Sequence, residues 1–214
     1  MKKSLPLIFI AFTLAGTASA QITKGSVFLG GDVGGYTQKT KSEDVVTNKS
    51  GGIYIMPVLG KAIRENLVFG INAGLNITDS EAPPNNGAMK SEGYSAGVFL
   101  RKYKNIGTSG FYIFIQGGLG ANHQLQKNTG TYVSYDRTKR TTIGLTAYPG
   151  ISYAIGKKFH LESGFNNLLM INYQHEKRQT GTPVTTYKTN GFGVSSSLQN
   201  SSALYLGFRV LIGK

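Results

Sequence analysis

Apolar and polar residues alternate along most of this chain with a period of two. The clearest segment is 67–78, where Leu67, Phe69 and Ile71 begin an apolar face and glycine, asparagine and threonine occupy the other. A helix would need apolar residues three and four positions apart, so this pattern predicts a β-strand. At about 3.3 Å per residue, a strand of this length can cross a bilayer core at a steep tilt.

The same alternation recurs along the chain and predicts eight strands in all. The other segments are 26–34, 52–63, 94–101, 111–122, 142–155, 159–173 and 204–212. An even number of strands is typical of a single-chain antiparallel membrane barrel.

The links between these segments alternate in length. Those at 64–66, 105–109 and 156–158 are short, and those at 37–49, 79–90, 123–140 and 174–201 are long and rich in Thr, Ser, Asn, Gly and Lys. Short periplasmic turns alternating with long external loops are typical of outer-membrane barrels. The predicted fold is therefore all-β: an eight-stranded antiparallel up-and-down transmembrane β-barrel with four long outer loops.

The two strand faces differ in composition. The minority face carries Gly, Asn, Ser and Tyr with few charges, which suits the narrow interior of an eight-stranded barrel. The apolar face, exemplified by Ile71, Leu145 and Leu206, is predicted to face lipid. Aromatic residues near its strand ends resemble the two aromatic girdles of membrane barrels: Tyr94, Phe111, Tyr153, Phe159, Tyr173 and Phe208.

The first residues have the pattern of a secretory signal peptide. Two lysines follow Met1, an apolar run extends over 5–15, and small residues precede a predicted cleavage after Ala20. The apolar run is too short for a membrane anchor, which needs about 20 residues. The prediction is a signal peptide at 1–20 and one barrel domain at 21–214. The chain has no cysteine, which excludes disulfides and thiolate metal sites.

Three sequence motifs resemble a known family. The first is a strand that contains Pro57, followed by a turn and a second strand, and a similar motif recurs around Pro149. The last is the final strand, which reads LYLGFRV over 204–210. With the signal peptide, these resemble the small outer-membrane β-barrel family common in Bacteroidetes, similar in architecture to the barrel of the outer-membrane protein A group. The resemblance covers essentially the whole mature chain and implies insertion by the barrel-assembly machinery. Such barrels usually end on an aromatic residue; this chain ends on Lys214, and Phe208 is the candidate for that role.

Four charged residues have inward parity: Asp32, Arg101, Glu162 and Arg209. Charges in a narrow lumen must pair or meet water, because an isolated buried charge is costly. The prediction is a structural ion network that fills the lumen. A gate in a narrow pore is the alternative.

The formal net charge is +13, and basic residues gather in two long links. They form a predicted basic outer-loop patch: Lys127, Arg137, Lys139, Arg140, Lys177, Arg178 and Lys188. Cations at this position would bridge the phosphates of lipopolysaccharide. A purely solvated loop surface is the plainer interpretation. Nucleic acid is not an expected partner, because a secreted barrel seldom meets it.

An enzyme would need a nucleophile and a base near the outer leaflet. His175 lies at that end with Glu176 and a serine run at 195–197, but neighbouring strand residues point to opposite faces. No catalytic, cofactor or metal site is predicted.

The functional prediction is a monomeric integral outer-membrane barrel with a filled lumen and a structural or surface-interaction role through its four outer loops. Two alternatives stay open, a narrow passive pore and a lipid-A-modifying enzyme. A soluble lipocalin-like barrel is disfavoured, since the chain lacks tryptophan.

Overall fold

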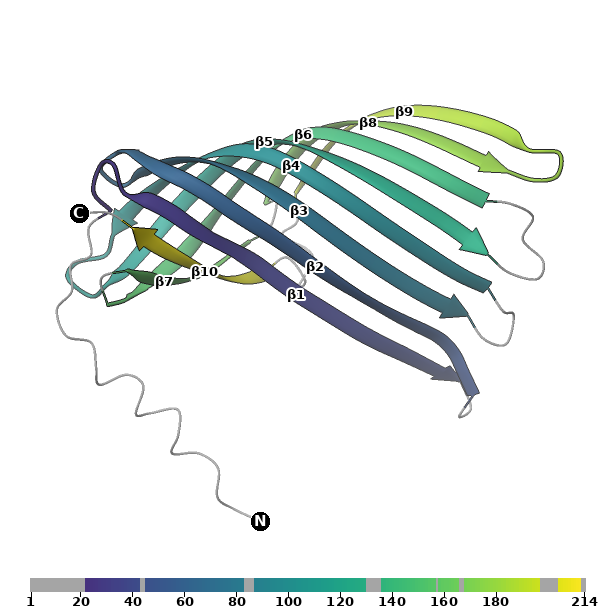
Figure 1. Cartoon of the computed structure of the whole chain (residues 1–214), viewed down its shortest axis with the longest axis horizontal. Coiled ribbons are helices and arrows are strands. Elements are labelled where there is room, and N and C mark those ends of the chain that lie inside the picture. The colour runs from purple at the N-terminus through teal and green to yellow at the C-terminus, as the bar shows by residue number, and fades with distance from the viewer. Residues whose placement is uncertain are drawn as a thin grey trace, which may run out of the picture.

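The computed structural model describes residues 22–42, 45–82, 87–129, 136–156, 158–165, 168–196 and 204–212. The predicted signal peptide and its cleavage site lie outside these residues. Among the described residues, no helix is long and apolar enough to cross a membrane. The strands are β1 (Val27–Ser42), β2 (Val45–Arg64), β3 (Leu67–Ala82), β4 (Gly87–Asn105), β5 (Phe111–Thr129), β6 (Asp136–Ile155), β7 (Phe159–Phe165), β8 (Leu169–Thr180), β9 (Thr185–Ser196) and β10 (Leu204–Ile212) (Figure 1).

The strands form an antiparallel up-and-down barrel. Consecutive strands from β1 to β6 pair with one another, and both β7 and β8 pair with β6. β9 pairs with β8, while β10 pairs with β7 and with β1. The two halves β7 and β8 thus make the seventh strand, and β9 and β10 make the eighth. The predicted eight-stranded antiparallel barrel is confirmed.

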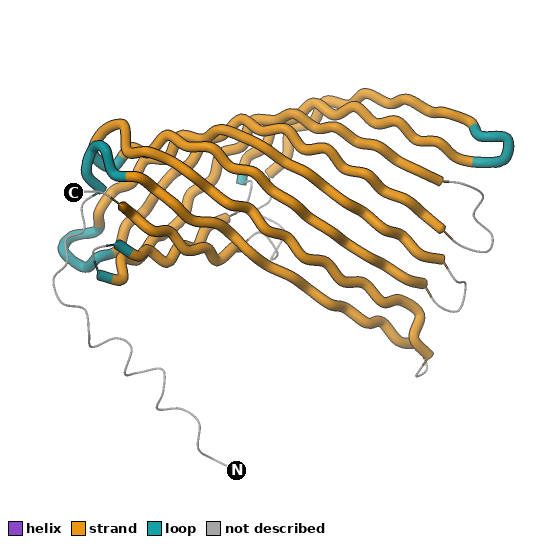
Figure 2. The backbone as a smooth tube through the Cα atoms, in the orientation of Figure 1, coloured by secondary structure: helices purple, strands orange, loops and turns teal. Residues whose placement is uncertain are grey.

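The two ends of the barrel are built differently, as Figure 2 shows. At one end β1 meets β10, with Val27 opposite Ile212, and the turns after β2, β4 and β6 are short; we call this the closed end. Its turns use the left-handed backbone region at Asn66, Gly107 and Gly156. At the other end, the loop end, the strands extend furthest. Within the described residues, β1 beyond Asp32 pairs only with β2, and β9 only with β8.

Side chains alternate between the interior and the outer wall. Ile71, Leu145 and Leu206 are 51%, 54% and 70% exposed and therefore point outward, as the alternation predicts. The interior at the closed end holds buried aromatic and aliphatic side chains, among them Phe28, Val68, Phe99, Tyr103, Tyr112 and Phe114. Ile22, just before β1, is fully buried with them and accepts a hydrogen bond from the backbone N–H of Asn66.

The predicted long links are largely strand, which corrects the sequence interpretation. β1 continues to Ser42 and β2 begins at Val45, and similar extensions lengthen β3 to β6. The link predicted over 174–201 contains the end of β8 and all of β9. The extensions of β1 to β6 and the end of β8 are largely polar on both faces, so they lack the alternation that marks a half-buried strand. Their ladder hydrogen bonds and their many β-branched threonines stabilise the extended conformation. In β9, Phe192 and Val194 do alternate, and they point outward opposite Tyr173 and Ile171, a short signal that the sequence interpretation missed.

Candidate functional site

The barrel interior near the closed end brings four distant charged residues together. Asp32 on β1, Arg101 on β4, Glu162 on β7 and Arg209 on β10 are each buried. These are the four residues that strand parity placed inside the barrel. We call them, with the partners described below, the ion network.

Glu162 is the centre of this network. Its Oε2 accepts a hydrogen bond from Nη1 of Arg101 at 2.6 Å, and its Oε1 accepts one from the Tyr103 hydroxyl at 2.7 Å. Nε of Arg209 lies 3.3 Å from the same Oε2, which is an ion-pair distance without hydrogen-bond geometry. Because β5 and β6 separate β4 from β7 in the sheet, the bond from Arg101 to Glu162 crosses the barrel interior.

Arg209 connects the network to β1. Its Nη2 donates to Oδ1 of Asp32 at 2.9 Å, and its Nη1 donates to the carbonyl oxygens of Gly31 and Phe208 at 2.9 and 2.8 Å. Gly207 leaves room for this arrangement, since a Cβ there would collide with Asp32 Oδ1 and come within 2.9 Å of Arg209 Nη1. The two guanidinium groups and two carboxylates sum to zero formal charge.

Aromatic rings surround the Arg101 guanidinium. Its Cζ lies 4.4 Å from the ring centroid of Phe114 and 5.3 Å from that of Phe28. Nε of Arg101 donates to Oε1 of Gln116 at 2.7 Å. A cation over aromatic faces is stabilised by the ring quadrupoles, and more strongly where water is excluded. The charges, their hydrogen-bond partners and these rings pack together in the barrel interior at this level.

Sequence reasoning missed Tyr103 and Gln116 as members of the network. Tyr103 shares the inward parity of Arg101, and Gln116 lies directly opposite Arg101 in the β4–β5 register. Parity alone was enough to place Tyr103 inside. The register was needed to bring Gln116 to Arg101, and closure of the barrel was needed to bring Arg101 to Glu162.

The three histidines lie apart from one another, but His160 borders the ion network: it lies directly opposite Arg209 in the β10–β7 register and two residues before Glu162 on the same inward face of β7. His160 points inward, with Nδ1 3.0 Å from Oγ of Ser152, and His123 is 2.9 Å from Oγ1 of Thr141 at the loop end. His175 contacts Oδ1 of Asn190 at 2.7 Å. In the part of the chain that the structure describes, no three His, Cys, Asp or Glu residues form a group that could hold a metal ion.

The arrangement that an outer-leaflet enzyme would need is not assembled around His175. Glu176 points to the opposite face of β8 and pairs there with Arg140. Ser195 and Ser196 lie opposite Met170 and Leu169, several residues along β8 from His175. Ser197 lies outside the described residues.

The seven basic residues predicted for the outer loops lie on β5, β6, β8 and β9 instead, because those strands extend beyond the apolar band. Two of them point inward. Arg140 pairs with Glu176 at 2.6 Å, and Arg178 donates to both carboxylate oxygens of Asp136 at 3.1 and 2.8 Å. The hydrogen bonds from Arg178 hold the pKa of Asp136 below its usual value.

The other five point outward and stand close to one another. Lys177 lies directly opposite both Lys139 and Lys188, and Lys127 lies opposite Arg137. Within the described residues, none of these five makes an ion pair. Like charges directly opposite one another on neighbouring strands destabilise a sheet. We call these five residues the basic outer face: Lys127, Arg137, Lys139, Lys177 and Lys188.

Comparison with known proteins identifies a fold and no family. No family model matches the chain, and no curated protein matches its sequence. Among solved structures, the outer membrane protein OprG of Pseudomonas aeruginosa is similar with a TM-score of 0.54 and 13% identity, over 91% of this chain and 99% of that chain. Neisserial surface protein A (TM-score 0.43, 18% identity) and a major outer membrane protein of Thermus thermophilus (0.47, 9%) also align, each over 87% of this chain and 99% of theirs. The likeness to OprG shows that this fold is one used by outer-membrane barrels.

Proposed function

We propose that this protein is an integral outer-membrane barrel that does not conduct, and that it acts at the cell surface through its basic loop end. The closed end then lies on the periplasmic side and the loop end outside. The ion network carries this proposal. Four buried charges that are paired with one another and packed between aromatic rings support an interior that is closed to water and ions at that level.

The membrane location is supported by the outer wall. Large apolar side chains such as Ile53, Leu75 and Leu119 are 67%, 51% and 48% exposed, and they recur on successive strands around the barrel. In water, an apolar band of this extent would drive aggregation, whereas in a bilayer it is solvated by acyl chains. Exposed aromatic residues at its edges, including Tyr94, Tyr173 and Phe159, are consistent with two membrane interfaces.

Planar-bilayer recording tests the filled interior and separates it from the narrow pore. Wild-type protein should insert without steady current. The double variant Arg101→Ala/Glu162→Ala removes the pair that crosses the interior and should produce a measurable current. A steady ohmic current from the wild type would favour the pore instead.

In this proposal, the surface role is the binding of lipopolysaccharide. The basic outer face lies beyond the apolar band, at the height where lipid A and core phosphates would stand. Phosphates between facing lysines would relieve the repulsion between Lys139, Lys177 and Lys188. The proposed role is therefore that the barrel binds the lipopolysaccharide of the leaflet around it and so stabilises the cell surface there.

Binding of lipopolysaccharide to protein reconstituted in phosphatidylcholine nanodiscs tests this role. The triple variant Lys139→Gln/Lys177→Gln/Lys188→Gln should bind more weakly, and its salt dependence should be shallower, because fewer phosphate contacts release fewer counterions. A control variant, Lys39→Gln/Lys41→Gln on β1, removes loop-end charge away from the basic outer face. Equal loss in both variants would show only a general charge effect.

Mass spectra of lipid A from cells with and without the protein test the enzyme alternative, since a change in its acyl or phosphate groups would support that activity.

A further inference from the structure

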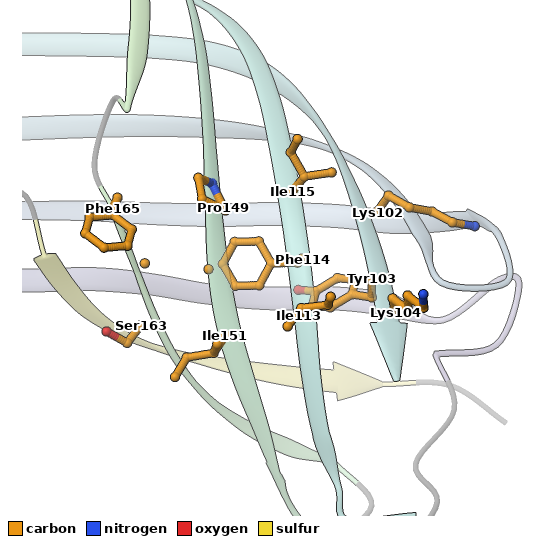
Figure 3. Close-up of a pocket in the computed structure, with 12 residues that line it drawn as sticks. Lys102, Tyr103, Lys104, Ile113, Phe114, Ile115, Pro149, Ile151, Ser163 and Phe165 are labelled. Atoms are coloured by element: carbon orange, nitrogen blue, oxygen red, sulfur yellow. The ribbon is translucent and has the colours of Figure 1, made fainter. Parts of the chain in front are cut away.

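A groove crosses the outer wall of the barrel near the closed end. It has a volume of about 550 Å³ and spans β4, β5, β6 and β7 (Figure 3). Gly150 and Gly164 lie directly opposite one another within it, and neither has a side chain to fill the wall. The space inside Gly150 is taken by the ring of Phe114, which a Cβ on Gly150 would strike. Because these two glycines add no side chain to the wall, a shallow channel runs between two rows of outward side chains, and we call this channel the track.

Each of these rows begins with a lysine and continues with apolar residues. In one row Lys104 lies opposite Ile113, which lies opposite Ile151. In the other, Lys102 lies opposite Ile115, which in turn lies opposite Pro149. Figure 3 shows both lysines at one side of the groove and Phe165 at the other. The groove is therefore cationic at one end and apolar along its length.

The lysine end is at the edge of the apolar band. Both lysine side chains are exposed, and Nζ of Lys102 lies 3.5 Å from the carbonyl oxygen of Glu65 in the turn after β2. That contact directs the ammonium group toward the closed-end rim. Lysines placed in this way keep their charge at a membrane interface while their stems lie along the apolar wall.

We propose that this groove is a binding site for an anionic glycerophospholipid of the periplasmic leaflet. The phosphate lies between Lys102 and Lys104, and one acyl chain follows the track past Ile113 and Pro149 toward Phe165. Charge complementarity at the rim and an apolar channel leading away from it match an anionic head with an attached chain. The inference rests on the membrane location and orientation proposed above.

A second groove of similar size supplies an internal comparison. It has a volume of about 520 Å³, lies over β1, β2, β3 and β10, and is lined by residues such as Leu29, Ala73 and Phe208. None of its lining residues is charged. If apolar volume alone selected lipids, the two grooves would behave alike. The lysines predict that only the first one prefers an anionic lipid.

Native mass spectrometry of the protein released from mixed phosphatidylcholine and phosphatidylglycerol bilayers tests the site. Wild-type protein should retain phosphatidylglycerol in preference to phosphatidylcholine. A lysine near an anionic headgroup contributes about a five-fold change in affinity, so Lys102→Gln/Lys104→Gln should lower retention by about 25-fold. Ser163→Phe, which fills the groove, should also lower retention. Inorganic phosphate in excess should not displace the lipid, because it lacks the chain.

Two matched controls complete the design. Ala73→Phe fills the second groove, and Lys61→Gln removes another exposed, outward-facing lysine on β2; both should retain phosphatidylglycerol as the wild type does. Equal retention of the two lipids, or equal loss with Ala73→Phe and Ser163→Phe, overturns the proposal. Displacement by inorganic phosphate would assign a plain anion site instead and also overturns it. Protein that fails to insert into either bilayer refutes the membrane location itself, while inserted protein without a lipid preference refutes only this site. If the double variant does not fold, Lys104→Gln and Ser163→Phe decide the matter.

Discussion

Removing the charge of Glu162 should destabilise the barrel strongly. Glu162→Gln leaves Arg101 and Arg209 facing a single carboxylate, that of Asp32, in an interior where all of these side chains are buried. Breaking a buried ion pair by removing one partner costs about 3–5 kcal/mol of unfolding free energy. Arg101→Met, which keeps an apolar stem against Phe114, should cost a similar amount.

The geometry also ranks the two couplings of Glu162. The bond from Arg101 Nη1 is 2.6 Å long, whereas Arg209 Nε stands at 3.3 Å and Arg209 has Asp32 as a second partner. Double-mutant cycles should therefore give about 2–3 kcal/mol of coupling for Glu162 with Arg101, and about 1 kcal/mol for Glu162 with Arg209. Arg140 and Glu176 at the loop end are the control pair. Their side chains are 44% and 21% exposed, so their coupling should stay below about 1 kcal/mol.

The cycles require reversible urea unfolding of protein folded into lipid vesicles. The chain contains no tryptophan, so far-ultraviolet circular dichroism and the electrophoretic mobility of the folded barrel would report the transition. Strict additivity of Glu162→Gln and Arg101→Met would refute the reasoning, as would a larger coupling in the exposed control pair than in the buried one.

Three further outcomes follow from the fold. Ile71→Lys, in the outward apolar band, should cost about 2–4 kcal/mol in vesicles, whereas Thr37→Lys, outward on β1 beyond the band, should cost at most about 1 kcal/mol; equal costs would mean that the band is misplaced. Gly207→Ala places a methyl group against Asp32 and Arg209 and should cost about 1–3 kcal/mol by urea unfolding, while Gly117→Ala, where the nearest atom to a Cβ is the carbonyl oxygen of Thr146 at 4.0 Å, should cost less. The folded-state pKa of Asp136 lies below its ordinary value. Its bond to Arg178 therefore stabilises the folded loop end fully at pH values above the unfolded-state pKa of about 3.9. This stabilisation is lost as the pH falls through the lower folded-state pKa. A carboxyl chemical-shift titration should show that low midpoint, and Arg178→Gln should raise it; an unchanged midpoint would exclude the bond in solution.

The alternation of side chains was enough to predict the barrel, its strand number and its inward charges. Period two decides which face each residue takes, and closure of a narrow barrel then forces Asp32, Arg101, Glu162 and Arg209 toward one another. The same rule failed at the loop end. There both faces are polar, so a strand extension and a loop have the same composition, and only ladder pairing separates them. This is why Lys139 and Lys177 were expected on loops, whereas they lie on strands.

The groove beside Lys102 and Lys104 was beyond the reach of sequence reasoning for a different reason. Its track depends on which outward residues of β4, β5 and β6 stand side by side, and that depends on register. Lys102 and Ile115 are separated along the chain, but the register makes them neighbours on the wall. Parity places both residues outward without showing that they share one row.

The short seam between β1 and β10 has a consequence for how the barrel folds. It joins Val27–Asp32 to Gly207–Ile212, residues that are nearly the whole chain apart, whereas the hairpins pair close neighbours in sequence. The entropic cost of closing a loop rises with its length, by about 0.6 kcal/mol for each doubling, so the hairpins form first and the seam closes last. Arg101 meets Glu162 across 61 residues, but Arg209 reaches Asp32 across 177 and does so only on closure. Until then, the free edges of β1 and β10 are open to pairing with another chain, which makes this final step the point at which folding competes with aggregation.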